Sequence, residues 1–175
     1  MEQWQVLENV SLRLVEPDDA KSLYSQIEKT RPQLAEFLPW GEAMKSVGDE
    51  EKFLIYSQER MNEKKFWNAS ILIGGKAVGM IDLHNIDFDN QRAEVGYWLG
   101  KDYQGNGVMT ACLKKLLEIG FLELKLHKIK LLAEVENTAS NAVAKKVGFN
   151  LEGLLKDEIF SNGKFHDANL YAIVH

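Results

Sequence analysis

The chain has 175 residues, of which 45% are hydrophobic and 27% charged, and this composition suits one folded domain with one core over residues 1–175. Its net charge of −5 disfavours a nucleic-acid partner, because nucleic-acid-binding proteins are usually basic. No apolar run reaches the roughly 18–20 residues that span a membrane, the N-terminus lacks the pattern of a signal peptide, and the single cysteine excludes an intrachain disulfide, so we expect a cytoplasmic protein.

The first predicted elements follow from alternation and from helix-start signals. Residues 11–15 alternate between polar and apolar side chains, which predicts a strand. A proline and two aspartates at 17–19 favour a helix start, and apolar residues then recur at helical spacing as far as Ile27. Prolines and glycines predict an irregular segment over residues 30–50, followed by a second helix at about 49–62.

Strand signals dominate the rest of the chain. A Gly-Gly hairpin turn at 74–75 separates the first two of them. The predicted strands span residues 67–73, 77–86, 93–99, 128–135, 149–160 and 165–174. Two helices are predicted between them, a long amphipathic one over 107–124 and a short one over 139–147. This order predicts an α/β fold, with a mixed sheet of about seven strands and helices on both faces.

The run Gln104-Gly105-Asn106-Gly107 lies between a predicted strand and the long helix. Glycine lets a backbone turn sharply and approach a ligand closely. The helix start beyond it offers unpaired amides and a partial positive charge, which suits a pyrophosphate. The run is neither the six-residue dinucleotide fingerprint nor a P-loop, and by itself such a run is more often an ordinary strand-to-helix turn than a phosphate site.

The order of motifs resembles the GNAT superfamily of acetyltransferases. Their phosphate loop reads Gln/Arg-x-x-Gly-x-Gly/Ala, and Gln104-Gly105-Asn106-Gly107-Val108-Met109 is similar, although Met109 replaces the small last residue. The continuation into Thr110 resembles the ribosomal-protein N-acetyltransferase (RimJ/RimL-type) branch. Further stretches like that branch are AEVGYWL at 93–99, ENTASN at 136–141, KVGF at 146–149, LEG at 151–153 and NLY at 169–171. The resemblance covers almost the whole chain and implies a splayed GNAT sheet that binds acetyl-CoA.

The resemblance also implies how acetyl-CoA is held. The strand at 93–99 should diverge from its neighbour, so that the pantetheine arm fills the gap and bonds backbone groups of Trp98 and Leu99. The amide near Trp98 would stabilise the oxyanion of the reacting thioester, an effect of roughly 3–4 kcal/mol in comparable sites. The other cofactor-binding residues expected are Gln104, Gly105, Asn106, Gly107, Val108, Met109, Thr110, Asn137, Asn141 and Lys146.

An amine must be neutral to attack, so a base has to take its proton. Glu94 is the first candidate, because it lies on the splayed strand and many GNAT enzymes carry a glutamate there. A salt-bridged or solvated strand glutamate is the alternative reading. His84, whose ordinary pKa allows a neutral base, and Glu158 are reserve candidates.

The leaving thiolate calls for an acid. Many GNAT proteins use a tyrosine on the short last helix, but Ala144 occupies that position here. The RimL-like branch offers a serine instead, here Ser140, with helix capping as the alternative role. Part of the branch also has a glutamate on the following strand, where this chain has Ile159, with Glu158 beside it on the opposite face.

The acceptor amine is the open part of the prediction. The resemblance favours the N-terminal α-amine of a protein such as a ribosomal protein; the alternatives are a small-molecule amine (polyamine, amino acid or antibiotic) and a non-catalytic acyl-CoA-binding module. The 30–50 segment, with Trp40 and Glu42, is expected to shape the acceptor pocket. No metal is expected, because the histidines lack ligand spacing, and Cys112 is predicted to be a buried thiol and not a nucleophile. The resemblance is compatible with a homodimer.

Overall fold

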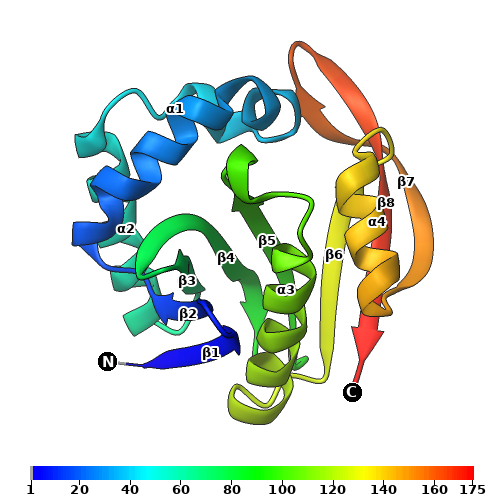
Figure 1. The fold of residues 1–175 in the computed structure, drawn as a ribbon. Coiled ribbons are helices and arrows are strands. Elements are labelled where there is room, and N and C mark those ends of the chain that lie inside the picture. Colours follow the sequence, from blue (N-terminus) through cyan, green and yellow to red (C-terminus); the bar gives the residue numbers. More distant parts are fainter. Residues whose placement is uncertain (1) are drawn as a thin grey trace.

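The computed structural model describes residues 2–175 and contains one sheet of eight strands, in the order β1-β2-β3-β4-β5-β6-β8-β7 (Figure 1). The strands are β1 (Gln3–Leu7), β2 (Val10–Leu14), β3 (Trp67–Ile73), β4 (Lys76–Asp87), β5 (Arg92–Leu99), β6 (Lys128–Glu134), β7 (Asn150–Ser161) and β8 (Lys164–Val174). All neighbouring strands are antiparallel except β5 and β6, which run parallel. The prediction of a mixed sheet is confirmed.

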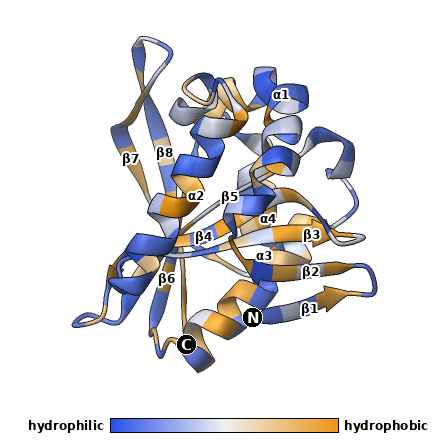
Figure 2. Ribbon diagram, turned by 90° about the vertical axis from the view of Figure 1, so that its left-hand side faces the viewer, coloured by the Kyte–Doolittle hydropathy of each residue, from blue (hydrophilic) through white to orange (hydrophobic). Residues whose placement is uncertain are grey.

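Helices cover both faces of this sheet, as predicted. They are α1 (Ala20–Phe37), α2 (Val47–Asn62), α3 (Val108–Glu118) and α4 (Thr138–Val147). On one face, Leu23 of α1 and Leu54 of α2 share a buried cluster with Met80 and Trp98 of the sheet. On the other, the buried side of α3 belongs to the larger cluster. Hydrophilic and hydrophobic colours alternate along α2 in Figure 2, as expected for a helix with one apolar face. None of the helices within residues 2–175 is long and apolar enough to cross a membrane.

The sequence-based count of about seven strands missed β1, at the edge of the sheet. Its side chains alternate between exposed and half-buried positions, and it pairs only with β2. Trp4 anchors it, with its ring centroid 5.5 Å from that of Trp67. The alternation is present in the sequence, but two glutamines among five residues make the apolar signal weak.

The prediction of an irregular segment over 30–50 was wrong for its first residues, because α1 continues through Pro32 as far as Phe37. A proline inside a helix lacks a donor and typically costs about 3 kcal/mol. Tertiary contacts offset this cost. The Arg31 guanidinium donates to the carbonyls of Gly41 at 2.6 Å and Met44 at 2.8 Å. The extension matters for the site, since it carries α1 over the end of β5.

The long helix predicted over 107–124 changes geometry within its span. Regular α3 ends at Glu118, and a π-helical segment, Ile119–Glu123, follows. A Cβ on Gly120 would lie 2.6 Å from Cδ1 of Ile129, so the segment packs tightly against β6. Single π turns commonly accommodate such local constraints within α-helices.

The strands β5 and β6 diverge after a short paired stretch. Their pairing runs only from Arg92 with Lys128 to Val95 with Leu131. Beyond that, β5 stays paired with β4 as far as Leu99, and β6 stays paired with β8 as far as Glu134. The expected splay is therefore present, and it leaves the inner edges of both strands without strand partners.

Candidate active site

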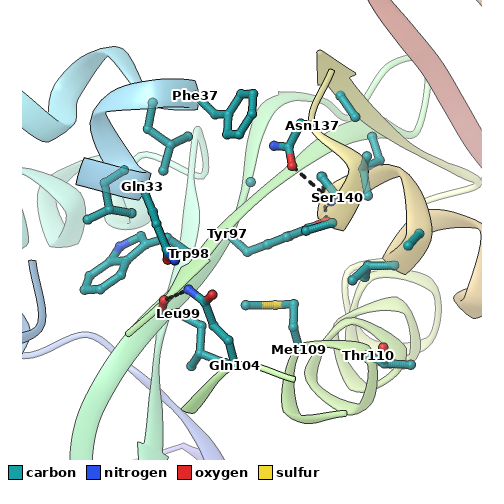
Figure 3. A pocket seen from close by; sticks show the side chains of 18 of the residues that line it. Gln33, Phe37, Tyr97, Trp98, Leu99, Gln104, Met109, Thr110, Asn137 and Ser140 are labelled. Atoms are coloured by element: carbon teal, nitrogen blue, oxygen red, sulfur yellow. Dashed lines mark hydrogen bonds between the residues drawn. The ribbon is translucent and has the colours of Figure 1, made fainter. Parts of the chain in front are cut away.

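A cavity of about 640 Å³ lies where β5 and β6 diverge (Figure 3). Its size is that of a cofactor or substrate site. The residues predicted for the site that line it are Trp98, Leu99, Gln104, Gly105, Gly107, Val108, Met109, Thr110, Asn137, Ser140 and Lys146. Asn106, Asn141 and Glu94 do not line it. The structure thus brings together most of a set that is spread over fifty residues of sequence.

The end of β5 forms one wall. After Val95 its edge toward β6 has no strand partner, so backbone groups there are free to bond an extended ligand. The Trp98 indole points away from this edge into the core beside α1, with its centroid 5.9 Å from that of Trp40. The Leu99 carbonyl accepts a hydrogen bond from Gln104 Nε2 at 2.7 Å, which ties the glycine loop to the strand end.

The glycine loop has the backbone conformation of an anion site. Gly105 and Gly107 have φ of +80° and +75°, in the left-handed region where a side chain is strained. Nothing lies within 4 Å of a Cβ built at either position, so both peptides face open space. Gly107 is also the N-cap of α3, whose first amides have no helical partner. Such amides favour a phosphate group.

A hydrogen bond between Tyr97 and Ser140 crosses the cavity from β5 to α4. Tyr97 Oη lies 2.8 Å from Ser140 Oγ (Figure 3). The start of α4 is capped by a different group, since Asn137 Oδ1 accepts from the Ser140 amide at 3.1 Å. Burial raises the pKa of Tyr97 despite the opposing effect of its bond to Ser140, so the phenol keeps its proton. Sequence analysis gave the Tyr97 side chain no role in the site and missed this contact.

Asn141 does not line the cavity, and its side chain instead bonds neighbouring parts of the fold. Its Nδ2 donates to the carbonyls of Glu134 at 3.0 Å and Asn137 at 2.7 Å. Its Oδ1 accepts from Asn169 Nδ2 at 2.8 Å and from the Tyr171 hydroxyl at 2.7 Å. These four bonds use the capacity of the buried amide and fasten the start of α4 to β6 and β8.

Glu94 lies away from the cavity, four residues before Trp98 and so about 13 Å along the strand. Its Oε1 is 3.4 Å from His84 Nε2, while His84 Nδ1 is 2.7 Å from Asp82 Oδ1. Burial alone would lower the pKa of His84, but hydrogen bonds to Asp82 and Glu94 raise it to about 9, so the ring is charged at pH 7. The bond to His84 in turn lowers the pKa of Glu94. This is the salt-bridged alternative, and it gives neither residue the properties of a general base.

A different carboxylate, Glu134 at the end of β6, lines the cavity. It is only 5% exposed. Its Oε1 lies 2.7 Å from His166 Nδ1, and its buried Oε2 has no hydrogen-bond partner among residues 2–175. Burial raises the pKa of Glu134, with Glu136 and Glu36 acting in the same direction and His166 and Lys164 opposing them. Its one sequence signal is its place at the carboxyl end of a parallel strand, where α/β sheets bind ligands.

Another wall of the cavity is formed by the end of α1 and by the β7–β8 hairpin. Gln33 and Phe37 of α1 line the cavity, as do Leu38 directly after the helix and Ile159 of β7, whereas Glu158 is exposed. Trp40 and Glu42, expected to shape this pocket, are not among the lining residues. The 30–50 segment therefore contributes through its helical part, which propensity alone did not predict.

The hairpin tip contacts the end of α1. Asn162 Nδ2 donates to the carbonyls of Ala35 and Glu36, each at 3.3 Å. Figure 1 shows the hairpin extending toward α1 above the gap between β5 and β6.

Cys112 of α3 is fully buried, and burial raises its pKa to about 12, as expected for an inert thiol.

The sequence and the fold of this chain are similar to those of known acetyltransferases. The family model described as acetyltransferase (GNAT) domain matches residues 9–150. A protein of Bacillus subtilis (strain 168), named ribosomal N-acetyltransferase YdaF, is 34% identical over 97% of this chain and 93% of its own. The ribosomal-protein-serine acetyltransferase of Escherichia coli (strain K12) is 32% identical over 96% of this chain and 94% of its own. A solved structure of RimL, a ribosomal L7/L12 α-N-protein acetyltransferase in complex with coenzyme A, superposes with a TM-score of 0.95 at 26% identity, covering 99% of this chain and 98% of that one.

Proposed function

Because the chain belongs to the GNAT acetyltransferase family and is an acetyl-CoA-dependent N-acetyltransferase, we propose that its acceptor is the N-terminal α-amine of a protein, such as a ribosomal protein. The names of the relatives that match nearly the whole chain support this choice. The eight strands of one sheet support residues 1–175 acting as a single catalytic domain.

The cavity between the diverging strands is the observation that supports our proposal for how acetyl-CoA is held. We assign the pyrophosphate to the amides after Gly105 and Gly107, and the pantetheine arm to the free edge at Trp98 and Leu99. In this arrangement the Trp98 amide stabilises the thioester oxyanion. Asn137 contacts the cofactor from α4, and so does Lys146. The remaining loop residues, Gln104, Asn106, Val108, Met109 and Thr110, shape the turn.

Ser140 is assigned the role of acid toward the leaving thiolate. Its hydroxyl is bonded to Tyr97, whose phenol keeps its proton, so a donor chain of two hydroxyls leads to the cavity. The helix-capping alternative does not use this hydroxyl, because Asn137 provides the cap.

An acceptor screen tests the proposal. Acetyl-CoA would be incubated with N-terminal peptides of ribosomal and other basic proteins, and in parallel with polyamines, amino acids and aminoglycosides, while free thiol is measured. We expect turnover with the peptides. Faster turnover of a small amine would reassign the acceptor, and acetyl-CoA binding without turnover on any amine would contradict an enzymatic role.

We also propose that the chain forms a homodimer, as the resemblance implies. The edge strand β7 supports this, because it exposes Leu151, Leu154 and Phe160, with Phe165 beside them on β8. An uncovered apolar sheet edge readily pairs with another chain. Light scattering should give twice the mass of 19.9 kDa, and the mass of one chain at micromolar concentration would contradict the proposal.

A further inference from the structure

Glu134 and Trp98 lie on the two strands that border the gap, and both line the cavity. Val95 is aligned with Leu131 in the parallel pair, and three residues further along each strand lead to Trp98 and Glu134. Aligned residues of parallel strands point to the same face. The Glu134 side chain therefore projects on the face of the Trp98 indole, which is the face that α1 covers.

The partner of Glu134 fixes its carboxylate. His166 Nε2 lies 3.1 Å from the Ser161 carbonyl, which can only accept, so Nε2 carries a hydrogen. His166 Nδ1 and Glu134 Oε1 then share one proton across 2.7 Å. This bond occupies Oε1 and leaves Oε2, buried and unpaired, as the polar atom available to a ligand. A buried carboxylate oxygen without a donor is unfavourable, and an ammonium group would satisfy it.

Charged residues from three neighbouring segments act on the Glu134 carboxylate. Glu36 approaches from α1, Glu136 from the loop after β6, and His166 and Lys164 from β8. Glu36 and Glu136 are both exposed. They extend the negative charge of the site toward solvent, along the route by which a cationic amine would enter.

We infer that Glu134 binds the amino group of the acceptor through Oε2 and takes its proton, with His166 as the positioning residue that holds the carboxylate. This inference rests on the proposed function and adds to it the site that recognises the amine. It gives Glu134 the work that sequence reasoning gave to Glu94, whose carboxylate is engaged by His84 far down the strand.

Acetyl transfer then uses Glu134 as the base and the Ser140–Tyr97 pair as the acid. The acceptor ammonium loses one proton to Glu134 Oε2, which releases it to solvent. The neutral nitrogen then forms a bond to the thioester carbon and gives its second proton to Glu134 Oε2. The carbon–sulfur bond breaks, its electron pair leaves with sulfur, and the sulfur takes a proton from the Ser140–Tyr97 pair. Exchange with solvent then returns both groups to their starting states. Base and acid thus act from opposite faces of β5, since Tyr97 points toward α4 and Glu134 toward α1.

Position 159 lies beside the same imidazole on the neighbouring strand, because Ile159 is the β7 partner of His166 in the β7–β8 pair. A carboxylate on either Glu134 or residue 159 would reach the same imidazole from neighbouring strands. In this chain the strand β6 supplies it.

The deciding experiment compares Glu134→Gln with wild type across pH, using the best peptide acceptor. Loss of a general base typically costs 10²–10⁴-fold in rate. We expect kcat to fall at least about a hundredfold at pH 7. The deficit should narrow toward pH 9, because an α-amine with a pKa near 8 then loses its proton to solvent. The affinity for acetyl-CoA, measured by calorimetry, should not change.

Three further variants separate catalysis from structure. Glu59→Gln removes an exposed charge on α2, outside the cavity lining, and should change kcat less than about twofold, as surface charges do. His166→Phe should shift the acidic limb of the pH profile upward, since His166 lowers the pKa of Glu134. Adding Ile159→Glu to Glu134→Gln should restore at least about a tenth of the wild-type rate, by the same general-base magnitude.

Two outcomes overturn the inference in different ways. If wild type acetylates peptides and folded Glu134→Gln keeps both its rate and its pH profile, the role of Glu134 is refuted while the proposed function stands. If wild type binds acetyl-CoA but transfers to no amine, the proposed function fails and the inference fails with it.

Discussion

Ser140 and Asn137 lie three residues apart at the start of α4, yet their side chains serve different neighbours. The Asn137 side chain accepts from an α4 amide, and the Ser140 hydroxyl bonds Tyr97 across the cavity. The sequence predicts polar residues at this helix start but cannot distinguish a cap from a catalytic hydroxyl. The two roles separate because only one of the side chains is needed to close the helix end.

Ser140→Ala should therefore lower kcat without lowering stability. We expect a loss of roughly 10²-fold, the lower end for a general acid, with the free energy of unfolding within about 0.5 kcal/mol of wild type. Asn137→Ala is the matched comparison and should lose about 1 kcal/mol of stability as a missing cap. Urea unfolding would measure the stability of both variants, and steady-state kinetics would measure their kcat. An unstable Ser140→Ala protein would contradict this division of roles.

Gly107→Val should abolish measurable acetyl-CoA binding, because it adds a side chain where the backbone meets the phosphates. It also strains a residue at φ +75°, so a control with equal strain is needed. Gly75→Val at φ +80°, in the β3–β4 turn, provides one. Each variant should lose about 1–3 kcal/mol of stability, and calorimetry should show lost affinity only for Gly107→Val. Equal affinity in both would remove the loop from the cofactor site.

At the scale of elements, α2 begins with a carboxylate inside the protein. Glu50 is fully buried, and neither of its oxygens has a hydrogen-bond partner among residues 2–175. Burial raises its pKa from 4.5 to about 7. The folded chain therefore holds the proton more tightly than the unfolded chain does, which makes α2 a pH-sensitive element.

The raised pKa of Glu50 makes the stability of the folded state depend on pH. Between pH 4.5 and about 7 the folded state binds more protons at Glu50, so the contribution of this group to stability falls as pH rises and is gone above pH 7. The full difference is on the order of 3 kcal/mol. Glu50→Gln should thus be more stable than wild type at pH 8 and should lose this part of the pH slope. Glu51→Gln, at an exposed site beside it, should behave as wild type, and parallel profiles for all three proteins would refute the assignment.

Elements with strong periodicity were predictable and elements held by tertiary contacts were not. The strands of the central sheet and the start of α3 follow from local pattern, as do both positions of the glycine turn. The last turns of α1 form across Pro32 because Arg31 reaches carbonyls ten and thirteen residues away, and no local propensity encodes such a contact. The contact between Glu134 of β6 and His166 of β8 was not predictable for the same reason, because the two residues are far apart in the sequence.

At the scale of the whole molecule, the divergence of β5 from β6 splits the sheet into two blocks joined by a short parallel pair. Acetyl-CoA would contact both blocks and so act as a bridge between them. At 100 times its Kd, a ligand adds about 2.7 kcal/mol of stability. For a chain of this size we expect a rise in Tm of roughly 5–10 °C. Pantetheine, which lacks the pyrophosphate, should give a smaller shift, and an equal shift would argue against the role of the glycine loop.

The contact between Asn162 and the end of α1 has a consequence for how such a protein can diversify. The donor half is built from sheet edge and helix starts, where most substitutions would disturb the core. The acceptor side proposed here lies beside a hairpin tip that contacts α1 through the Asn162 amide. Changes in the length or composition of that tip could retarget the enzyme to a wider or narrower amine while its use of the acetyl donor persists. Substrate range and cofactor use are thus separable traits in this architecture, open to selection and to engineering one at a time.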